Sequence, residues 1–448
     1  MMKQLVNLSH AKWMAILAIL ISFAVVFSIA ASNDPLDLAK TNASSLVPMP
    51  KITIPPRATK LVSAESFGIH IHRPKLNEPW PLKGAGSWRL WDVYLGWRDI
   101  QPKMGVFVFS KLDSIVAYAN KNNIKLVLPL GNTPQWASAR PQETCAYGLG
   151  CAAEPSNMMF WRLYVRTIAN RYAGKIFEYE LLNEVNLKPF WSGDMSKLLE
   201  MQKIAYEEIK AVNPNNILIG PSMTGNAEAE LSKWDAYLAS GATQYMDVAS
   251  YHLYVPKSNP ETAYGLTERL FSIMQQNGIA NKPLFNTESG WLIKNMQGPE
   301  IPTSYSAEWL RLDQDLAMAY VVRAQVLAFT QGIQRYYWYS LDHTNMGLIE
   351  PLSFNKKAAG FAYNTLASQL VATQPMGCDL SRLPIWVCTF KMQSGKNKYL
   401  VWSTSDAKSN FDFSFIAPLS KRIDFPLGVE EDLRGNTLLI GQVPVILQ

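Results

Sequence analysis

Two glutamates that end apolar runs are the residues best suited to chemistry in this sequence. Glu184 closes the run that begins at Phe177, and Glu288 closes the run that begins at Pro283. Two carboxyl groups that flank a glycosidic bond can cleave it, because one protonates the leaving oxygen while the other attacks or stabilises the anomeric carbon. A lone glutamate at a strand end is usually a solvated side chain or a helix cap. The pair, with Asn183 directly before the first, favours the catalytic interpretation.

These glutamates belong to a chain in which short β-rich runs alternate with longer helical patterns. The expected strands are Phe67–Ile71, Trp88–Trp91, Ile124–Leu130, Ile176–Leu182, Ile217–Gly220, Met246–Ser250, Leu284–Thr287 and Arg335–Tyr339. Helices are expected at Leu112–Asn122, Met158–Tyr172, Met195–Val212 and Gln314–Gln331. This spacing predicts an α/β fold, and eight strands over roughly 290 residues favour a (β/α)8 TIM barrel. No Gly-x-Gly-x-x-Gly follows the first strand, so a dinucleotide fold has no support.

A barrel of this kind would bring the two glutamates together. Active sites on it collect at the carboxyl ends of the strands. Glu184 ends the fourth expected strand and Glu288 the seventh, and these two strands lie across the barrel mouth. We therefore expect the two carboxylates to face one another over a cleft.

The chain divides into four expected parts. Residues 61–360 would form the barrel, and residues 361–448, which show strands without helices between them, a small antiparallel β domain. That domain is interpreted as a structural flank, with carbohydrate binding as the alternative. Residues 1–31 are expected to be a signal peptide or membrane anchor, and residues 32–60, rich in Pro and Ser, a linker.

Export is the expectation for the folded part of the chain. An uncharged apolar run from Trp13 to Ala31 approaches the ~20 residues that span a bilayer, and Ser28 to Ala30 resemble a cleavage site. Both interpretations place the rest of the chain outside the cytoplasm, in the periplasm, anchored on the inner membrane or secreted. The net charge of +6 is spread over 448 residues without a dense basic block, which disfavours a nucleic-acid partner.

Four cysteines fit that compartment: Cys145, Cys151, Cys378 and Cys388. They allow three disulfide pairings, of which pairing between sequence neighbours is the simplest; four buried free thiols are the alternative. Zinc is disfavoured, because no Cys-x-x-Cys or histidine cluster accompanies them.

Several motifs together resemble the clan A glycoside hydrolases. The resemblance runs from about Phe67 to Tyr363 and is nearest to family 39, which includes exported endoglycosidases of biofilm exopolysaccharides. The motifs are Leu182 to Glu184, Thr287 to Trp291, Trp88 to Asp92, Trp97, Gly105 to Phe107, and Leu130 to Ala137. The Asn-Glu pair is moderately specific alone, and its combination with the second glutamate is strong.

The resemblance implies a role for each matching residue. Glu184 would be the acid/base and Glu288 the nucleophile of a double displacement that retains anomeric configuration. Asn183 would hydrogen-bond the 2-hydroxyl of the sugar. Arg89 would lie beside the nucleophile, and in the His-x-Tyr motif of His252 and Tyr254 the tyrosine hydroxyl would contact it. The resemblance implies no metal and no organic cofactor.

Other side chains are candidates for binding sugar. Trp338 would form the aromatic platform under the reacting sugar, on the assumption that it points inward. His70 could point into the cleft or belong to the core, and a core position is equally open for His252. Arg89 could be a structural ion-pair partner instead.

The loop from Arg140 to Ser156 is expected to project over the cleft. It carries Cys145 and Cys151, so a disulfide would stiffen it into a rim, with Trp136 and Trp161 as candidate walls of the sugar subsites.

The function expected from these observations is retaining hydrolysis of β-glycosidic bonds in an envelope or extracellular polysaccharide, by endo cleavage. An exo-acting enzyme such as a β-xylosidase is the first alternative, since endo and exo action differ by loop shape. A non-catalytic carbohydrate-binding envelope protein on the same barrel is the second. The sugar, its linkage and the oligomeric state stay open.

Overall fold

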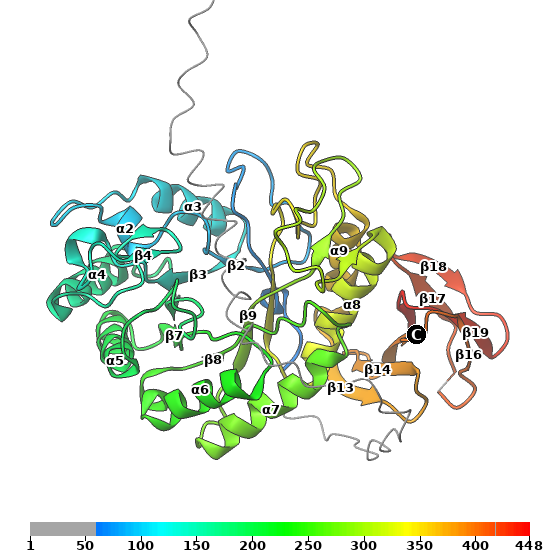
Figure 1. Ribbon diagram of the computed structural model, residues 1–448. Coiled ribbons are helices and arrows are strands. Elements are labelled where there is room, and N and C mark those ends of the chain that lie inside the picture. Colours follow the sequence, from blue (N-terminus) through cyan, green and yellow to red (C-terminus); the bar gives the residue numbers. More distant parts are fainter. Residues whose placement is uncertain (1–59, 417) are drawn as a thin grey trace, which may run out of the picture.

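An eight-stranded parallel sheet forms the centre of the computed structural model, which describes residues 60–416 and 418–448 (Figure 1). Its strands are β1 (Phe67–Ile69), β2 (Ser87–Arg89), β3 (Lys125–Leu130), β6 (Glu178–Leu181), β7 (Ile217–Ile219), β8 (Ala249–Ser250), β9 (Leu284–Ser289) and β12 (Arg335–Trp338). In space they follow the order β7-β6-β3-β2-β1-β12-β9-β8. Each strand lies beside its predecessor in sequence, as in a barrel. The eight expected strands are confirmed.

The seam between β7 and β8 closes the barrel with few contacts. Isolated parallel bridges join Ile219 to Val248 and Thr224 to His252, and the amide of Gly220 donates to the Val248 carbonyl at 2.9 Å. Both strands are short, so no longer ladder forms there. The result is a nearly closed (β/α)8 barrel, which confirms the predicted fold class.

Side chains fill the barrel interior. An apolar layer consists of Val127, Ile219, Val248, Phe285 and Tyr337. Gly68 on β1 leaves room for this layer, because a Cβ there would lie 2.4 Å from the Tyr337 ring. The filled interior leaves the carboxyl ends of the strands as the place for a site.

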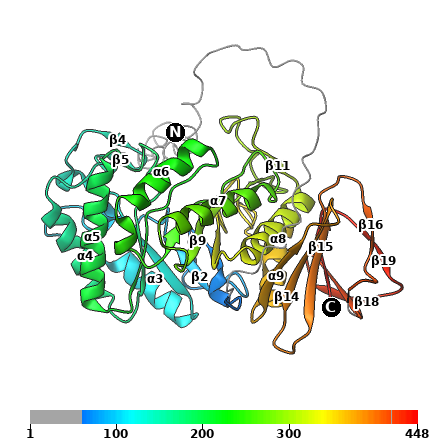
Figure 2. The same ribbon diagram turned by 90° about the horizontal axis from the view of Figure 1, so that it is seen from below.

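Helices cover the outer face of the sheet (Figures 1 and 2). They are α3 (Ser110–Lys121), α4 (Met158–Arg171), α5 (Met195–Val212), α6 (Glu228–Ala239), α7 (Thr262–Gln276), α8 (Gln314–Thr330) and α9 (Ala358–Leu370), with the short α2 (Trp97–Ile100) before them. Asp313 caps α8 by accepting the Leu316 amide at 2.9 Å. The four expected helices are confirmed.

A second, antiparallel sheet follows the barrel. Its strands are β13 (Gln374–Asp379), β14 (Ile385–Lys391), β15 (Asn397–Ser403), β20 (Val445–Leu447), β17 (Lys421–Asp424) and β18 (Val429–Asp432), with β16 (Ser409–Asp412) and β19 (Thr437–Ile440) as a separate pair. Cys378 and Cys388 are opposed on β13 and β14 and form a disulfide. Helix α9 crosses residue 361, the expected boundary between barrel and β domain.

Aromatic side chains join this sheet to the barrel helices. Trp402 donates its indole N–H to Glu261 at 2.7 Å, and the same carboxylate oxygen accepts from Arg323 of α8 at 2.8 Å. Trp386 stacks on Trp402 and meets Tyr264 of α7 edge-on. These tryptophans face the barrel, which favours the structural flank over a carbohydrate-binding row.

The leader expected at residues 1–31 and the linker up to residue 59 lie outside the described residues. Within the part of the chain that the structure describes, no helix is long and apolar enough to cross a membrane.

Candidate active site

Glu184 and Glu288 meet at the mouth of the barrel. Glu184 follows β6 in a tight turn in which its φ is +43°, a left-handed conformation that non-glycine residues seldom adopt. The Glu184 amide donates to Ser222 Oγ at 3.3 Å, which supports this turn. Glu288 lies on β9. Both side chains are buried, and one carboxylate oxygen of each lies within 4.8 Å of the other.

That separation bears on the chemistry available. Retaining glycosidases hold their carboxyl groups about 5–5.5 Å apart, whereas inverting enzymes need about 6.5–9.5 Å to admit a water molecule. The geometry of Glu184 and Glu288 fits the shorter class, in which one carboxylate attacks the sugar directly.

Arg89 is the centre of a buried network beside the pair. Its guanidinium donates to Glu288 Oε2 at 3.0 Å and to Asn183 Oδ1 at 2.8 Å, while its Nε donates to Glu180. Arg89 is fully buried. One cation thus contacts Glu288 and Asn183 together, and it also forms the buried ion pair with Glu180.

Glu180 belongs to this network although the sequence did not single it out. It lies inside the barrel on β6, fully buried, and Thr287 donates its hydroxyl to Glu180 Oε1 at 2.9 Å. The signal was available in the strand, because residues two apart share a face and Glu178 and Glu180 therefore both point inward.

His252 and Tyr254 follow β8 and each reaches one member of the pair. Nδ1 of His252 lies 2.9 Å from Glu184 Oε1, and the Tyr254 hydroxyl donates to Glu288 Oε1 at 3.0 Å. Burial lowers the pKa of His252, although its hydrogen bond to Glu184 opposes this change. The imidazole is therefore neutral at neutral pH and orients Glu184 without adding charge.

The electrostatics of the pair centre on Glu288. Burial raises the pKa of Glu288 well above its usual range, and the neighbouring Glu184 carboxylate raises it further; Arg89 and the Tyr254 hydroxyl oppose both effects. Two buried carboxylates this close resist ionising together. The pair therefore retains one proton over a wide pH range, and the two donors to Glu288 favour keeping the charge on Glu288.

Among the described residues, Glu184, His252 and Glu288 form the group that most resembles a metal-binding site. Ligand atoms of Glu184, His252 and Glu288 all lie within 4.8 Å of one another. The Arg89 guanidinium bonded to Glu288 opposes the binding of a further cation there.

His70 supports the strand that carries Glu288. Its Nε2 lies 3.0 Å from the Thr287 carbonyl oxygen, and its ring meets Tyr339 at 5.2 Å. Burial lowers the pKa of His70 well below its usual range, and the charge of Arg89 adds to this effect. His70 is therefore a neutral residue at the mouth that contacts the backbone beside the pair.

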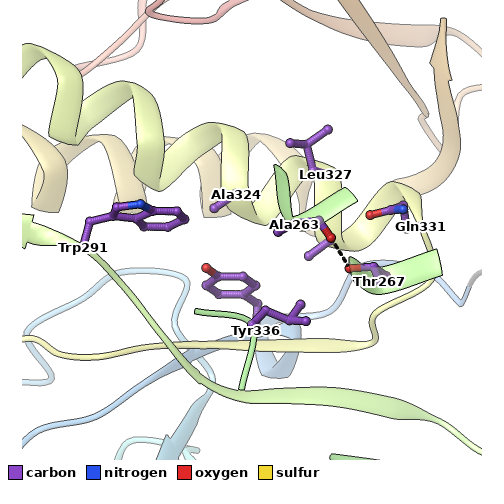
Figure 3. Close-up of a pocket in the computed structure, with 9 residues that line it drawn as sticks. Ala263, Thr267, Trp291, Ala324, Leu327, Gln331 and Tyr336 are labelled. Atoms are coloured by element: carbon purple, nitrogen blue, oxygen red, sulfur yellow. Dashed lines mark hydrogen bonds between the residues drawn. The ribbon is translucent and has the colours of Figure 1, made fainter. Parts of the chain in front are cut away.

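The assumption that Trp338 points inward is wrong. Trp338 is fully buried in the layer between strands and helices, where it stacks on Trp291. Tyr336, two residues earlier, lies on the same outer face and lines a small cavity under α8 (Figure 3). The alternate residues Tyr337 and Tyr339 face the interior and the mouth. The aromatic residue that lies at the site at the end of β12 is therefore Tyr339 and not Trp338.

The two tryptophans expected as subsite walls also lie elsewhere. Trp161 is fully buried on α4 and donates its indole N–H to the Met201 carbonyl of α5. Trp136 packs between Trp97 and Phe160 and donates to the Gln101 carbonyl. Both aromatic side chains are part of the packing between barrel and helices.

The disulfide expected in the loop from Arg140 to Ser156 is present, and Tyr147 is the aromatic residue in the turn beside it. Cys145 and Cys151 form a disulfide that spans the hairpin of β4 (Thr144–Cys145) and β5 (Gly148–Leu149). Tyr147 lies in the turn of this hairpin and donates its hydroxyl to Asp92. The structure thus has the local disulfide pairing at both cysteine pairs.

Comparison with known proteins agrees with this fold. The model of the family described as Cellulase (glycosyl hydrolase family 5) matches residues 91–330, more than half of the chain. The barrel with its pair of strand-end glutamates thus has the form of a clan A glycoside hydrolase. The chain belongs to the cellulase family, glycosyl hydrolase family 5.

Solved structures with the same fold come from neighbouring families. A family 39 glycoside hydrolase from Bacteroides cellulosilyticus is 20% identical with a TM-score of 0.67, covering 87% of this chain and 82% of that one. A family 39 β-xylosidase from Caulobacter crescentus is 15% identical with a TM-score of 0.61, covering 87% and 97%. A family 30 endoxylanase from Clostridium papyrosolvens is 14% identical with a TM-score of 0.58, covering 87% and 96%.

A curated relative adds a sequence match. Endo-1,4-β-xylanase C from Paenibacillus barcinonensis is 27% identical over 146 residues, which is 30% of this chain and 12% of that protein's length. Families 5, 30 and 39 consist of retaining O-glycosyl hydrolases that act by double displacement. The predicted resemblance to clan A is confirmed, with family 39 among the structural neighbours.

Proposed function

We propose that this protein is an exported, endo-acting glycoside hydrolase that cleaves β-glycosidic bonds within a polysaccharide, with Glu288 as nucleophile and Glu184 as acid/base. One observation carries the proposal. The two carboxylates face each other at the barrel mouth with oxygens within 4.8 Å, and each has its own set of orienting partners.

In the first step, Glu288 attacks the anomeric carbon while Glu184 gives its proton to the leaving glycosidic oxygen. A glycosyl ester of Glu288 forms, and the negative charge that held the proton on the pair disappears. Glu184 then takes a proton from water, whose oxygen attacks the anomeric carbon and releases Glu288. Asn183, fixed by Arg89, is positioned to contact the sugar hydroxyl next to the reacting carbon.

The similar proteins support a xylan-type backbone as the first substrate to test. The curated relative is named an endo-1,4-β-xylanase, and one structural neighbour is named an endoxylanase. The β-xylosidase from Caulobacter crescentus supports exo cleavage as the alternative. Product lengths from a defined oligosaccharide separate the two modes directly.

Export rests on two features of the chain. The apolar run from Trp13 to Ala31 follows a basic start, as in a leader or anchor. Both cysteine pairs are oxidised, at Cys145–Cys151 and Cys378–Cys388, and disulfides persist outside the reducing cytoplasm. We propose the periplasm or the outer face of the inner membrane as the place of action.

The test uses the full chain and β-linked polysaccharides and hexasaccharides, with product anomers followed by NMR. We expect internal cleavage with retained configuration, and a fall of about 100- to 10,000-fold in Glu184→Gln, because general acid catalysis contributes that much. Glu288→Gln should form no product. Inverted products, or unchanged cleavage in both variants, would refute the assignment. Sugar binding without cleavage by the unaltered chain would favour the carbohydrate-binding protein.

A further inference from the structure

Asp92 is a carboxylate at the barrel mouth that the proposed mechanism does not use. It follows β2 with a φ of +58°, and two tyrosine hydroxyls donate to it from different parts of the chain. Tyr147 of the disulfide hairpin donates to Oδ1 at 2.5 Å, and Tyr339 after β12 donates to Oδ2 at 2.6 Å.

This arrangement is fixed before any sugar binds. The amide of Ala146 donates to the Pro189 carbonyl at 3.0 Å, and Arg98 donates to the carbonyl of Tyr147. The Tyr147 ring also packs edge-on against Trp91 at 5.5 Å. The hairpin is thus held from three sides with its tyrosine on Asp92, so Asp92 has a single orientation.

Asp92 lies within electrostatic reach of the reacting pair. Its charge contributes to the raised pKa of Glu288, and the pKa of Tyr147 is raised by burial and by the charges of Asp92, Glu288 and Glu184. Asp92 remains partly exposed, unlike Glu180, whose charge Arg89 neutralises inside the barrel. Asp92 lies three residues after Arg89, which bonds Glu288, and its partner Tyr339 donates its own amide to the carbonyl of Ser289, the residue after Glu288, at 2.8 Å. Asp92 is therefore a partly exposed carboxylate close to the reacting pair.

The chemistry of such a carboxylate limits what it can bind. Its two oxygens offer about four lone-pair sites, and the two tyrosines occupy one on each oxygen. The remaining sites accept hydrogen bonds, so they suit adjacent hydroxyls of a sugar ring. A uronic acid placed there would bring a second carboxylate against the first, which is unfavourable at short range in a partly buried site.

We infer that Asp92 determines specificity in the sugar subsite beside Glu288, accepting hydroxyls of a neutral sugar and rejecting a uronate. This inference rests on the proposed function, since the subsite is defined by the reacting pair. It goes further, because it names the charge class of the sugar and a residue outside the double displacement.

The test compares kcat/KM on xylo-, cello- and manno-hexaose with that on hexamers of mannuronate and glucuronate, and also measures their binding to the Glu288→Gln chain by calorimetry. The unaltered protein should prefer neutral sugars. Asp92→Asn should lower kcat/KM on the neutral sugar by about 10- to 100-fold, since hydrogen bonds to a charged group are worth that factor. The same substitution should also lower the ratio of kcat/KM on neutral sugars to kcat/KM on uronates by at least about tenfold.

Two further variants distinguish recognition of the sugar by the charge of Asp92 from an indirect effect of Asp92 on the two tyrosines that donate to it. Tyr147→Phe and Tyr339→Phe remove one donor each but keep the charge, so the neutral-to-uronate ratio should persist. Asp113→Asn is the matched control, because Asp113 also accepts a tyrosine hydroxyl, from Tyr172 at 2.9 Å, on the outer side of the barrel at α3. It should leave kcat/KM unchanged.

Each outcome decides the inference. Equal use of neutral and uronate sugars by the unaltered chain, or the same ratio in Asp92→Asn, would overturn it. If the unaltered chain binds neutral hexamers but does not cleave them, only the proposed function is overturned. The ratio of binding constants for neutral and uronate hexamers then tests the role of Asp92. Absence of both cleavage and binding across all hexamers would overturn both.

Discussion

Tyr254 and Glu288 are joined by a hydrogen bond of 3.0 Å from the phenolic hydroxyl to Oε1, while Arg89 bonds the other oxygen of the same carboxylate. Both carboxylate oxygens are therefore held by donors, which fixes the direction of the side chain. The donors also favour the ionised form of Glu288, which burial and the charge of Glu184 disfavour.

Removing the hydroxyl at position 254 tests this balance. Tyr254→Phe should lower kcat/KM by about 10- to 100-fold, the worth of a hydrogen bond to a charged group. Because the lost donor stabilised the carboxylate, the pKa of Glu288 rises further, and the acid limb of the pH–activity profile should move to higher pH. Tyr237→Phe is the control, since that hydroxyl bonds Gln202 within the helical layer. An unmoved acid limb would contradict the prediction.

The proton that the pair of Glu184 and Glu288 retains predicts a pH dependence of stability. The buried pair takes up this proton more readily than the separate carboxyl groups of the unfolded chain, so its contribution is complete below pH ~4.5 and is lost as pH rises through the raised pKa of the folded pair. Glu288→Gln removes one of the two buried charges and should therefore unfold at higher urea than the unaltered chain at pH 7 but not at pH 4. Glu228→Gln, which loses an exposed pair with Arg269, should show no such gain.

The disulfide at the rim should affect substrate binding more than the fold. Replacing Cys145 and Cys151 with alanine removes a short crosslink, at a cost of about 2 kcal/mol in unfolding free energy, and frees Tyr147 from Asp92. We expect KM to rise with little change in kcat. The Cys378–Cys388 pair supplies the matched control, because it lies in the C-terminal sheet and its loss should leave KM unchanged. Identical kinetics of both variants would rule out a role for the rim.

Position 338 and position 339 should respond in opposite ways. Trp338→Phe leaves a gap in the layer under the helices and should cost about 1–3 kcal/mol in stability with KM unchanged. Tyr339→Phe keeps the ring, loses the bond to Asp92, and should raise KM with little loss of stability. Urea denaturation and steady-state kinetics on both variants measure the contrast. A KM effect confined to Trp338→Phe would mean that the orientation of β12 is misassigned.

The barrel and its two strand-end glutamates could be predicted because both depend on local patterns. Alternation of strand and helix fixes the order of the elements, and the carboxyl ends of strands share one edge of a barrel. Glu184 and Glu288 follow from that rule directly.

Other features depend on contacts that no local pattern encodes. Tyr336, Tyr337, Trp338 and Tyr339 are all aromatic, so no alternation of polar and apolar residues reveals which face is inward. The pairing of β12 with β9 also shifts register between Tyr336 and Trp338. Asp92 and Tyr147 are 55 residues apart, and their contact requires the hairpin to be in place.

Helix α8 limits how the chain can be divided. Every residue from Ala317 to Thr330 is buried, because α8 packs against the neighbouring helices α7 and α9, the barrel strand β12, and the strands β13 and β14 of the C-terminal sheet. A protein shortened before Gln374 would expose an apolar helix surface to water, and such surfaces promote aggregation. The catalytic barrel and its β flank are therefore one unit of inheritance, and exchange of domains between related enzymes would have to carry both.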